Sequence, residues 1–104
     1  MTTQWTDFAW QMLSQTADYI LSEYGTTAYA TFLNDVDNGV RTLMQFPQSG
    51  HVEPLLKDRI VLYRSIVINN HNKLVYFIDE EKSIIQITDF WDTRREPSLL
   101  IKSI

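Results

Sequence analysis

The sequence predicts an α+β fold, in which an N-terminal helical hairpin packs on a small, twisted antiparallel sheet. Apolar side chains recur at helical spacing through residues 8–44, whereas residues 59–91 hold three runs of β-prone side chains separated by short polar turns. Short turns of this kind join neighbouring antiparallel strands. At 104 residues the chain has the size of one domain, so we assign residues 1–104 to a single domain.

The start of the first helix is marked by several local signals. Residues 2–5 are predicted to form a short edge strand, and Thr6 is a suitable N-cap after it. Asp7 favours the positive end of a helix dipole, and Trp5 can pack back on the first helical turn. We therefore expect the helix to begin at Asp7.

Gly25 is the expected C-cap of this first helix, and a second helix is predicted to run from Thr26 until Pro47 forces its end. A connection of so few residues makes the two helices antiparallel. We expect their apolar faces to form the core with the sheet. The side chains predicted to be largely buried are Trp5, Phe8, Leu13, Phe32, Val36, Leu43, Ile66 and Val75.

The C-terminal half is predicted to be the sheet. Residues 48–58 contain Gly and Pro and should form an irregular connection, followed by strands over about 59–68, 73–79 and 83–91. Continuous apolar runs at residues 60–62 and 66–68 interrupt the alternation expected of a strand with one solvated face. We interpret them as strands buried on both faces.

Composition limits the function classes. The chain has no cysteine, so disulfides and thiolate metal sites are excluded. His51 and His71 are isolated, so we expect no metal and no cofactor. No stretch approaches the roughly 18 apolar residues of a membrane span, and Met1 is not followed by basic residues as in a signal peptide. We expect a cytoplasmic protein without a membrane partner.

Charge is divided unevenly along the chain, whose net charge is −4. Residues 1–56 carry six acidic and one basic side chain, net −5, and residues 57–104 carry eight basic and seven acidic side chains, net +1. The acidic helical half would repel nucleic acid, which argues against direct nucleic acid binding. Any anion-binding surface should lie on the sheet half.

Several short motifs occur in a characteristic order. The predicted helices are followed by Phe-Pro-x-x-Gly at residues 46–50, Tyr-Arg at 63–64, a basic residue three positions before Tyr76, and Arg-Arg-x-Pro at 94–97. In this order the chain, from Trp5 to Pro97, resembles toxins of the RelE/ParE superfamily from bacterial type II toxin–antitoxin modules. The resemblance implies the same α+β fold and a cognate antitoxin protein as partner.

The resemblance also implies a site. Superfamily members that cut mRNA on the ribosome use basic residues of the central strands and the C-terminal end of the sheet to stabilise phosphate charge. Carried over residue by residue, the candidate target-binding or antitoxin-binding residues are Arg64, Lys73, Tyr76, Trp91, Arg94 and Arg95.

Departures from that pattern favour the ParE-like branch, whose characterised members poison DNA gyrase. Trp91 stands where many relatives carry histidine, and tryptophan cannot transfer a proton. Lys73 replaces an arginine and loses its bidentate geometry. No tyrosine or histidine follows Pro97. We therefore predict binding rather than catalysis, with no confident catalytic residue.

Two alternatives remain open. One is a ribosome-dependent mRNA endonuclease, of the RelE type, that uses Arg64, Lys73, Arg94 and Arg95. The other is an inactive family member that only binds antitoxin. In every case the antitoxin tail would dock as a helix in a groove or as a strand on a sheet edge, and the helix pair and residues 99–101 are candidate contact surfaces.

The adjacent arginines form the last candidate feature. Residues alternate faces along an extended chain, so Arg94 and Arg95 should point in opposite directions. We expect one to fold over the sheet face toward Arg64, and the other to reach solvent, Asp92 or Glu96. Simple ion pairing within the tail is the competing interpretation.

Overall fold

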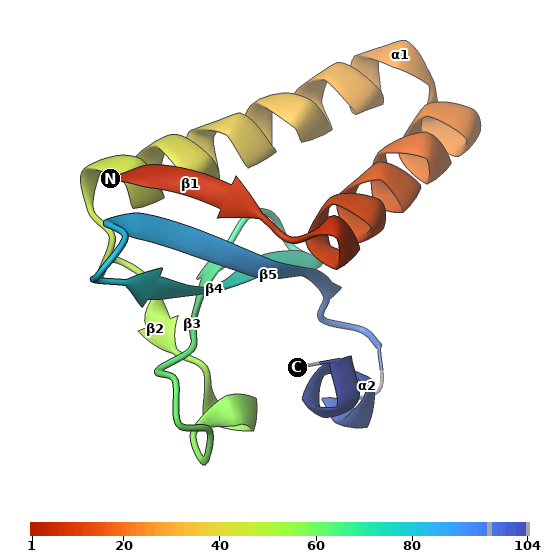
Figure 1. Ribbon diagram of the computed structural model, residues 1–104. Helices are drawn as coiled ribbons and strands as arrows, with labels where there is room; N and C mark the ends of the chain where they lie inside the picture. Colours follow the sequence, from red (N-terminus) through yellow and green to blue (C-terminus); the bar gives the residue numbers. More distant parts are fainter. Residues whose placement is uncertain (96, 104) are drawn as a thin grey trace.

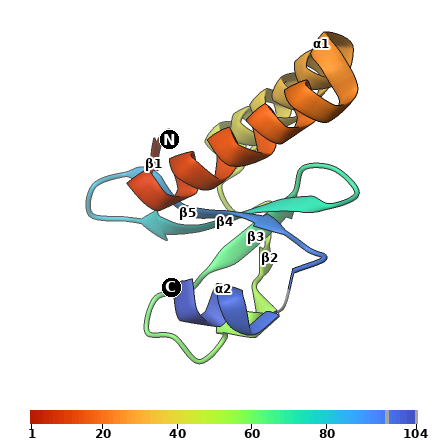
Figure 2. The same ribbon diagram turned by 90° about the vertical axis from the view of Figure 1, so that its right-hand side faces the viewer.

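The computed structural model describes residues 1–95 and 97–103, and its sheet has helices on both faces (Figures 1 and 2). The elements are, in chain order, β1 (Thr2–Trp5), α1 (Asp7–Gln45), β2 (His51–Val52), the 3-10 helix η1 (Pro54–Leu56), β3 (Arg64–Val67), β4 (Asn72–Asp79), β5 (Ile84–Asp92) and α2 (Pro97–Ser103). The sheet order is β1-β5-β4-β3-β2. The predicted α+β class is confirmed.

The N-terminal end of α1 follows its sequence signals closely. The Thr6 hydroxyl accepts a hydrogen bond from the amide of Ala9 at 3.0 Å, which caps the first turn. The ring of Trp5 packs edge-on against Trp10, with ring centroids 6.0 Å apart. These two positions flank the cap as in a hydrophobic staple, so the first turn is fixed against β1.

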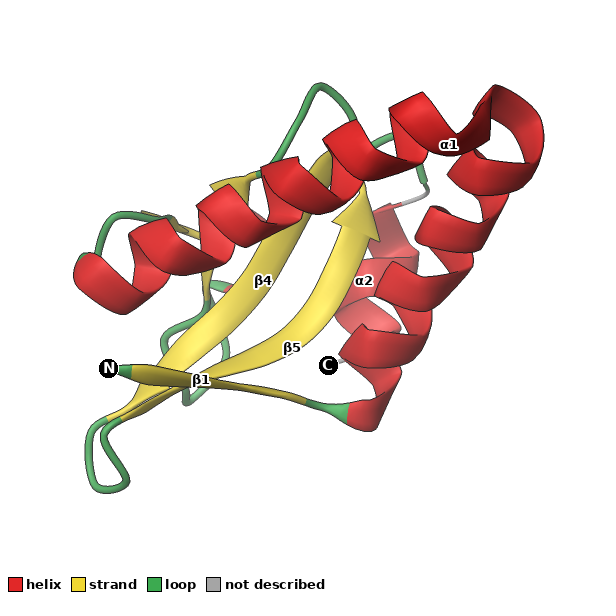
Figure 3. Ribbon diagram, turned by 90° about the horizontal axis from the view of Figure 1, so that it is seen from above, coloured by secondary structure: helices red, strands yellow, loops and turns green. Residues whose placement is uncertain are grey.

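The long helix α1 is two helical arms joined at Gly25, which has φ 90° and ψ −176°. Residues with a Cβ atom rarely adopt this backbone conformation, so glycine is required for the reversal. The arms diverge from Gly25 and lie across one face of the sheet (Figure 3). The predicted helical hairpin is thus confirmed, with its second arm ending at Gln45 before Pro47.

The sheet is mixed, which corrects the predicted purely antiparallel arrangement. β1 runs parallel to β5, with Thr2 beside Ile84 and Trp5 beside Ile87, while the other strand pairs are antiparallel. Two parallel strands need a long crossover connection between them. Here α1, β2, β3 and β4 all come between β1 and β5 in the sequence.

The strand predicted over residues 59–68 is wrong in its first half, because β3 begins only at Arg64. Residues 59–63 instead form part of a loop after η1, with Ile60 fully exposed and Val61 and Leu62 also exposed. β-prone side chains favour a strand only where a neighbouring strand is available for pairing. Residues 60–62 lie outside the sheet, and Val67 of β3 is 71% exposed, so the inferred burial on both faces is wrong for both apolar runs.

Two apolar clusters lie on opposite faces of the sheet. The larger lies under α1, and the smaller lies under α2 and η1. Figure 2 shows α1 and α2 on opposite sides of the sheet. Tyr76 of β4 and Phe90 of β5 belong to the first cluster. The buried members of the second are Leu56, Val75, Trp91 and Leu100.

The predicted burial holds for most of the named side chains. Leu13, Phe32, Val36, Leu43 and Val75 are buried, and Trp5 and Ile66 are partly buried. The prediction for Phe8 is wrong, because its side chain is 40% exposed on the solvent side of the first helical turn. In the predicted tail surface, residues 99–101, Leu100 is buried while its two neighbours are exposed.

Candidate functional site

A groove of about 980 Å³ lies between the diverging arms of α1 and the end of the sheet at the β3–β4 turn. Ile20 and Phe32, from the two arms, and Ile68, after β3, provide apolar lining. The polar part comes from the turn at residues 69–72 and from Asp92 and Arg94 at the end of β5. An apolar lining with a few polar groups at its margin is typical of a protein or ligand binding site.

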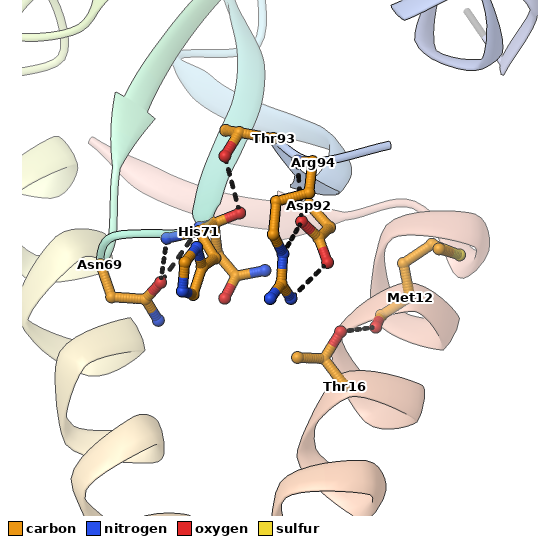
Figure 4. Close-up of polar contacts among 8 residues, drawn as sticks. Met12, Thr16, Asn69, His71, Asp92, Thr93 and Arg94 are labelled. Atoms are coloured by element: carbon orange, nitrogen blue, oxygen red, sulfur yellow. Dashed lines mark hydrogen bonds and ion pairs between the residues drawn. The ribbon is translucent and has the colours of Figure 1, made fainter. Parts of the chain in front are cut away.

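Local structure positions the polar side of this groove. The Asn69 side chain accepts hydrogen bonds from the backbone amides of His71, at 2.9 Å, and Asn72, at 3.0 Å, and so orders the turn. The hydroxyl of Thr93 donates to the carbonyl of His71 at 3.2 Å, which fixes the end of β5 beside it (Figure 4).

Arg94 and Asp92 form a bidentate ion pair at the groove margin. The Nε and Nη2 atoms of Arg94 lie 3.0 and 2.9 Å from the two carboxylate oxygens of Asp92 (Figure 4). The hydrogen bond from Arg94 lowers the pKa of Asp92, and the same bond raises the pKa of Arg94. The Arg94 side chain is still 64% exposed, so a partner in the groove can reach it.

Two tyrosines of the first arm line the groove. The rings of Tyr19 and Tyr24 meet edge-on, with centroids 6.2 Å apart, and both side chains are exposed. The neighbouring Tyr24 raises the pKa of Tyr19, so the Tyr19 phenol is neutral at physiological pH. Exposed tyrosines offer a large contact area and a polar hydroxyl group, and they are common in protein interfaces.

Lys73 and Trp91 lie on the other face of the sheet, beneath α2. The ammonium group of Lys73 forms an ion pair with Glu53, whose side chain is fully buried. None of the described residues donates a hydrogen bond to the second carboxylate oxygen of Glu53. Trp91 is 3% exposed, and the guanidinium of Arg95 stacks over its ring at 4.8 Å from the centroid.

Arg64 and Tyr76 occupy a third place, beside the loop that follows α1. They are register partners of β3 and β4 and so share the α1 face of the sheet. Arg64 donates to the carbonyl of Gly50 at 3.0 Å, and the Tyr76 hydroxyl donates to the carbonyl of Pro47 at 2.8 Å. Burial raises the pKa of Tyr76, against the opposing influences of a hydrogen bond from Gly50 and the charge of Arg64.

The candidate residues from the sequence are therefore not brought together in one site. Tyr76 and Trp91 are core residues in this structure, which corrects the expectation that they are available for contact with a target. Arg94 and Arg95 do point to different sides, but Arg94 pairs with Asp92 and Arg95 stacks on Trp91. Neither is shown in contact with Arg64, whose described hydrogen bond goes to Gly50. Glu96, the other predicted partner, lies outside the described residues.

Sequence reasoning missed two features of the site. The groove depends on how far the helical arms diverge at Gly25, which no sequence signal specifies. The second feature, the buried Glu53, had a weak signal in the sequence, because this acidic residue stands between Val52 and the apolar run Pro-Leu-Leu at 54–56. A carboxylate buried there needs a cation such as Lys73.

Comparison with known families agrees with this arrangement of helices and strands. Residues 3–97 match the family model described as the ParE toxin of the type II toxin–antitoxin system parDE. The chain belongs to the ParE toxin family. No curated protein matches this ParE-family chain. In the part of the chain that the structure describes, no helix combines the length and apolar character needed to cross a membrane.

Several solved structures have a similar fold. A chain of the chromosomal ParDE toxin–antitoxin system from P. aeruginosa superposes with a TM-score of 0.69 at 18% identity, covering 88% of this chain and 95% of that one. The YoeB/ParE toxin from Agrobacterium tumefaciens gives 0.60 at 18% identity, with coverages of 88% and 98%. The YoeB dimer from Staphylococcus aureus gives 0.58 at 16% identity, with coverages of 88% and 94%. At these identities the likeness shows the fold of the ParE-family chain.

Proposed function

We propose that this ParE-family chain inhibits bacterial growth by binding a macromolecular target, with DNA gyrase as the target that the family resemblance suggests. We propose further that a cognate antitoxin neutralises it. The observation that carries the proposal is the dispersal of the four cations that an endonuclease would need. Arg64 and Arg94 lie on the α1 side of the sheet, whereas Lys73 and Arg95 lie beside Trp91 on the other side. Each of the four is engaged with another group of the same chain.

Catalysis on an RNA phosphate needs basic groups that converge on the charge that develops there. Lys73 is held by Glu53 beneath α2, whereas Arg64 bonds to Gly50 on the α1 face. These two side chains start from opposite faces of the sheet, so they cannot clamp one phosphate without a rearrangement of the strands. The arrangement therefore supports a binding toxin over the endonuclease alternative.

The groove between the arms of α1 is the proposed docking site for the antitoxin. Its apolar lining suits one face of an amphipathic helix, and its polar margin suits the edge of that helix. Arg94 can pair with a carboxylate of the antitoxin, because its side chain is 64% exposed even while it is paired with Asp92.

Substitution of Ala28 tests this docking site, because Ala28 lines the groove and Ala30, two residues later, is exposed and outside it. Ala28→Arg should weaken binding of the purified antitoxin at least about tenfold, since a long charged side chain fills the groove. Ala30→Arg is the matched control and should bind normally. Equal affinities for the two variants would reject the groove as the docking site.

The activity itself is tested by induced expression in a bacterial host, with and without the antitoxin. Growth should stop without antitoxin and resume with it, and the purified protein should inhibit supercoiling by purified DNA gyrase. Primer extension on cellular mRNA should show no new cleavage sites. Codon-position cuts that disappear in Arg64→Ala and Lys73→Ala would establish the endonuclease instead, and growth that never slows would indicate an inactive family member.

A further inference from the structure

An apolar loop projects from the face of the sheet opposite α1. We call Ile60, Val61 and Leu62 the apolar tip; all three are exposed, and Ile60 is exposed over its whole side chain. Soluble proteins rarely expose a run of large apolar side chains unless the run binds something. The tip adjoins α2, whose Leu99 and Ile101 are also exposed, and the two segments lie together in Figure 2.

The tip is held in place by contacts at its base. The amide of Glu53 donates to the carbonyl of Tyr63 at 2.9 Å, which closes the loop across its two ends. The guanidinium of Arg59 donates to the carbonyl of Ile101 at 2.8 Å and ties the loop to α2. A loop fixed before binding loses little conformational entropy when it binds, so this tip is suited to contact a partner.

The charges beside the tip are mainly positive. Lys57 and Arg59 precede it, and Arg95 lies near α2 on the same side of the sheet. Among the described residues the acids near the tip are Asp58, which pairs with Arg59, and the buried Glu53, whose charge is balanced by Lys73. A partner surface with an apolar centre and an acidic margin would complement this patch.

A second copy of the chain fits the patch poorly. A two-fold contact would bring the same basic patch, with Lys57 and Arg59, together from both copies, and like charges in one interface repel. Contact with the acidic helical half of another copy would be head-to-tail and would build a ring or an open filament instead of a two-fold dimer.

We propose that the apolar tip, with the exposed side of α2, is the surface through which this toxin binds its protein target, and that the target surface is apolar with an acidic margin. This inference rests on the proposed function. It places target binding on the face of the sheet opposite the groove. A variant that loses target binding should therefore keep antitoxin binding, and the reverse.

The test compares Ile60→Asp/Leu62→Asp with Leu21→Asp/Leu33→Asp, a control pair of exposed leucines on α1 outside the groove. The tip variant should lose growth inhibition and bind purified DNA gyrase at least about tenfold more weakly, because aspartate faces the acidic margin. It should still bind antitoxin, and the control should behave as wild type in all three assays.

Each other outcome overturns the inference in a different way. A tip variant as toxic as wild type would reject this surface while leaving the proposed function standing. A wild-type protein that neither slows growth nor binds gyrase would reject the proposed function and this surface with it. Self-association of wild type in light scattering that the tip variant abolishes would show that the tip binds a second copy.

Discussion

The phenol oxygen of Tyr76 accepts a hydrogen bond from the backbone amide of Gly50 at 3.0 Å, in the buried space between β4 and the loop after α1. Only glycine permits this approach, because a Cβ atom at position 50 would lie 2.5 Å from that oxygen and 2.7 Å from the carbonyl oxygen of Ser65. The contact fixes the loop that joins the helical half to the sheet.

Tyr76→Phe should therefore destabilise the protein. It leaves the amide of Gly50 and the carbonyl of Pro47 without their hydrogen bonds to the hydroxyl, which should lower the free energy of unfolding by about 1–3 kcal/mol. Urea denaturation measures this loss. Tyr19→Phe, at an exposed position, is the control and should change stability by less than about 0.5 kcal/mol.

Lys73→Met should cost more, because it leaves the buried carboxylate of Glu53 without its cation. The expected loss is about 3–5 kcal/mol in the free energy of unfolding. The double variant Lys73→Met/Glu53→Leu removes both charges and should recover most of that loss. A double variant no more stable than Lys73→Met would show that the ion pair is not the source of the effect.

Gly25→Ala isolates the backbone cost of the turn between the arms. Nothing lies within 4 Å of the added methyl group, so the expected loss of about 1–3 kcal/mol comes from the positive φ alone. Thr26→Ala, at the next position, should stay within about 0.5 kcal/mol of wild type in the same denaturation experiment. Equal stability of wild type and Gly25→Ala would mean that the turn readily adopts another conformation.

The ion pair of Asp92 and Arg94 should contribute to stability only above acidic pH. Arg94 lowers the pKa of Asp92 below its ordinary value of 3.8, so the stabilisation is present above that pH and is lost as the pH falls through the folded-state pKa. Asp92→Asn should cost less than about 1 kcal/mol at neutral pH, since the pair is partly exposed. In denaturation experiments at a series of pH values, the difference in stability between wild type and Asp92→Asn should disappear in acid.

Local signals predicted the helical half well. Thr6 and Trp5 define where α1 begins, Gly25 where its arms meet, and Pro47 where it ends, because each acts on its own turn of backbone. The parallel pairing of β1 was not predictable in this way. Four residues of edge strand specify neither a partner nor a direction.

The candidate site was predicted less well, because the positions of side chains depend on faces and register. Lys73 and Tyr76 lie three residues apart in one strand, so alternation alone places them on opposite faces, as the structure shows. The irregularity between Val75 and Tyr76, where β4 shifts against β5, changes which residues oppose each other. That shift has no clear signature in the sequence.

The pairing of β1 with β5 also bears on when the toxin becomes complete during its synthesis. The first strand to leave the ribosome has its neighbour in the last strand, so the sheet cannot close until Ile84–Asp92 has emerged. A nascent chain with only α1 and the middle strands lacks the strand that links β1 to the rest of the sheet. The surfaces with which the chain can bind a partner are therefore complete only after its last strand has been made.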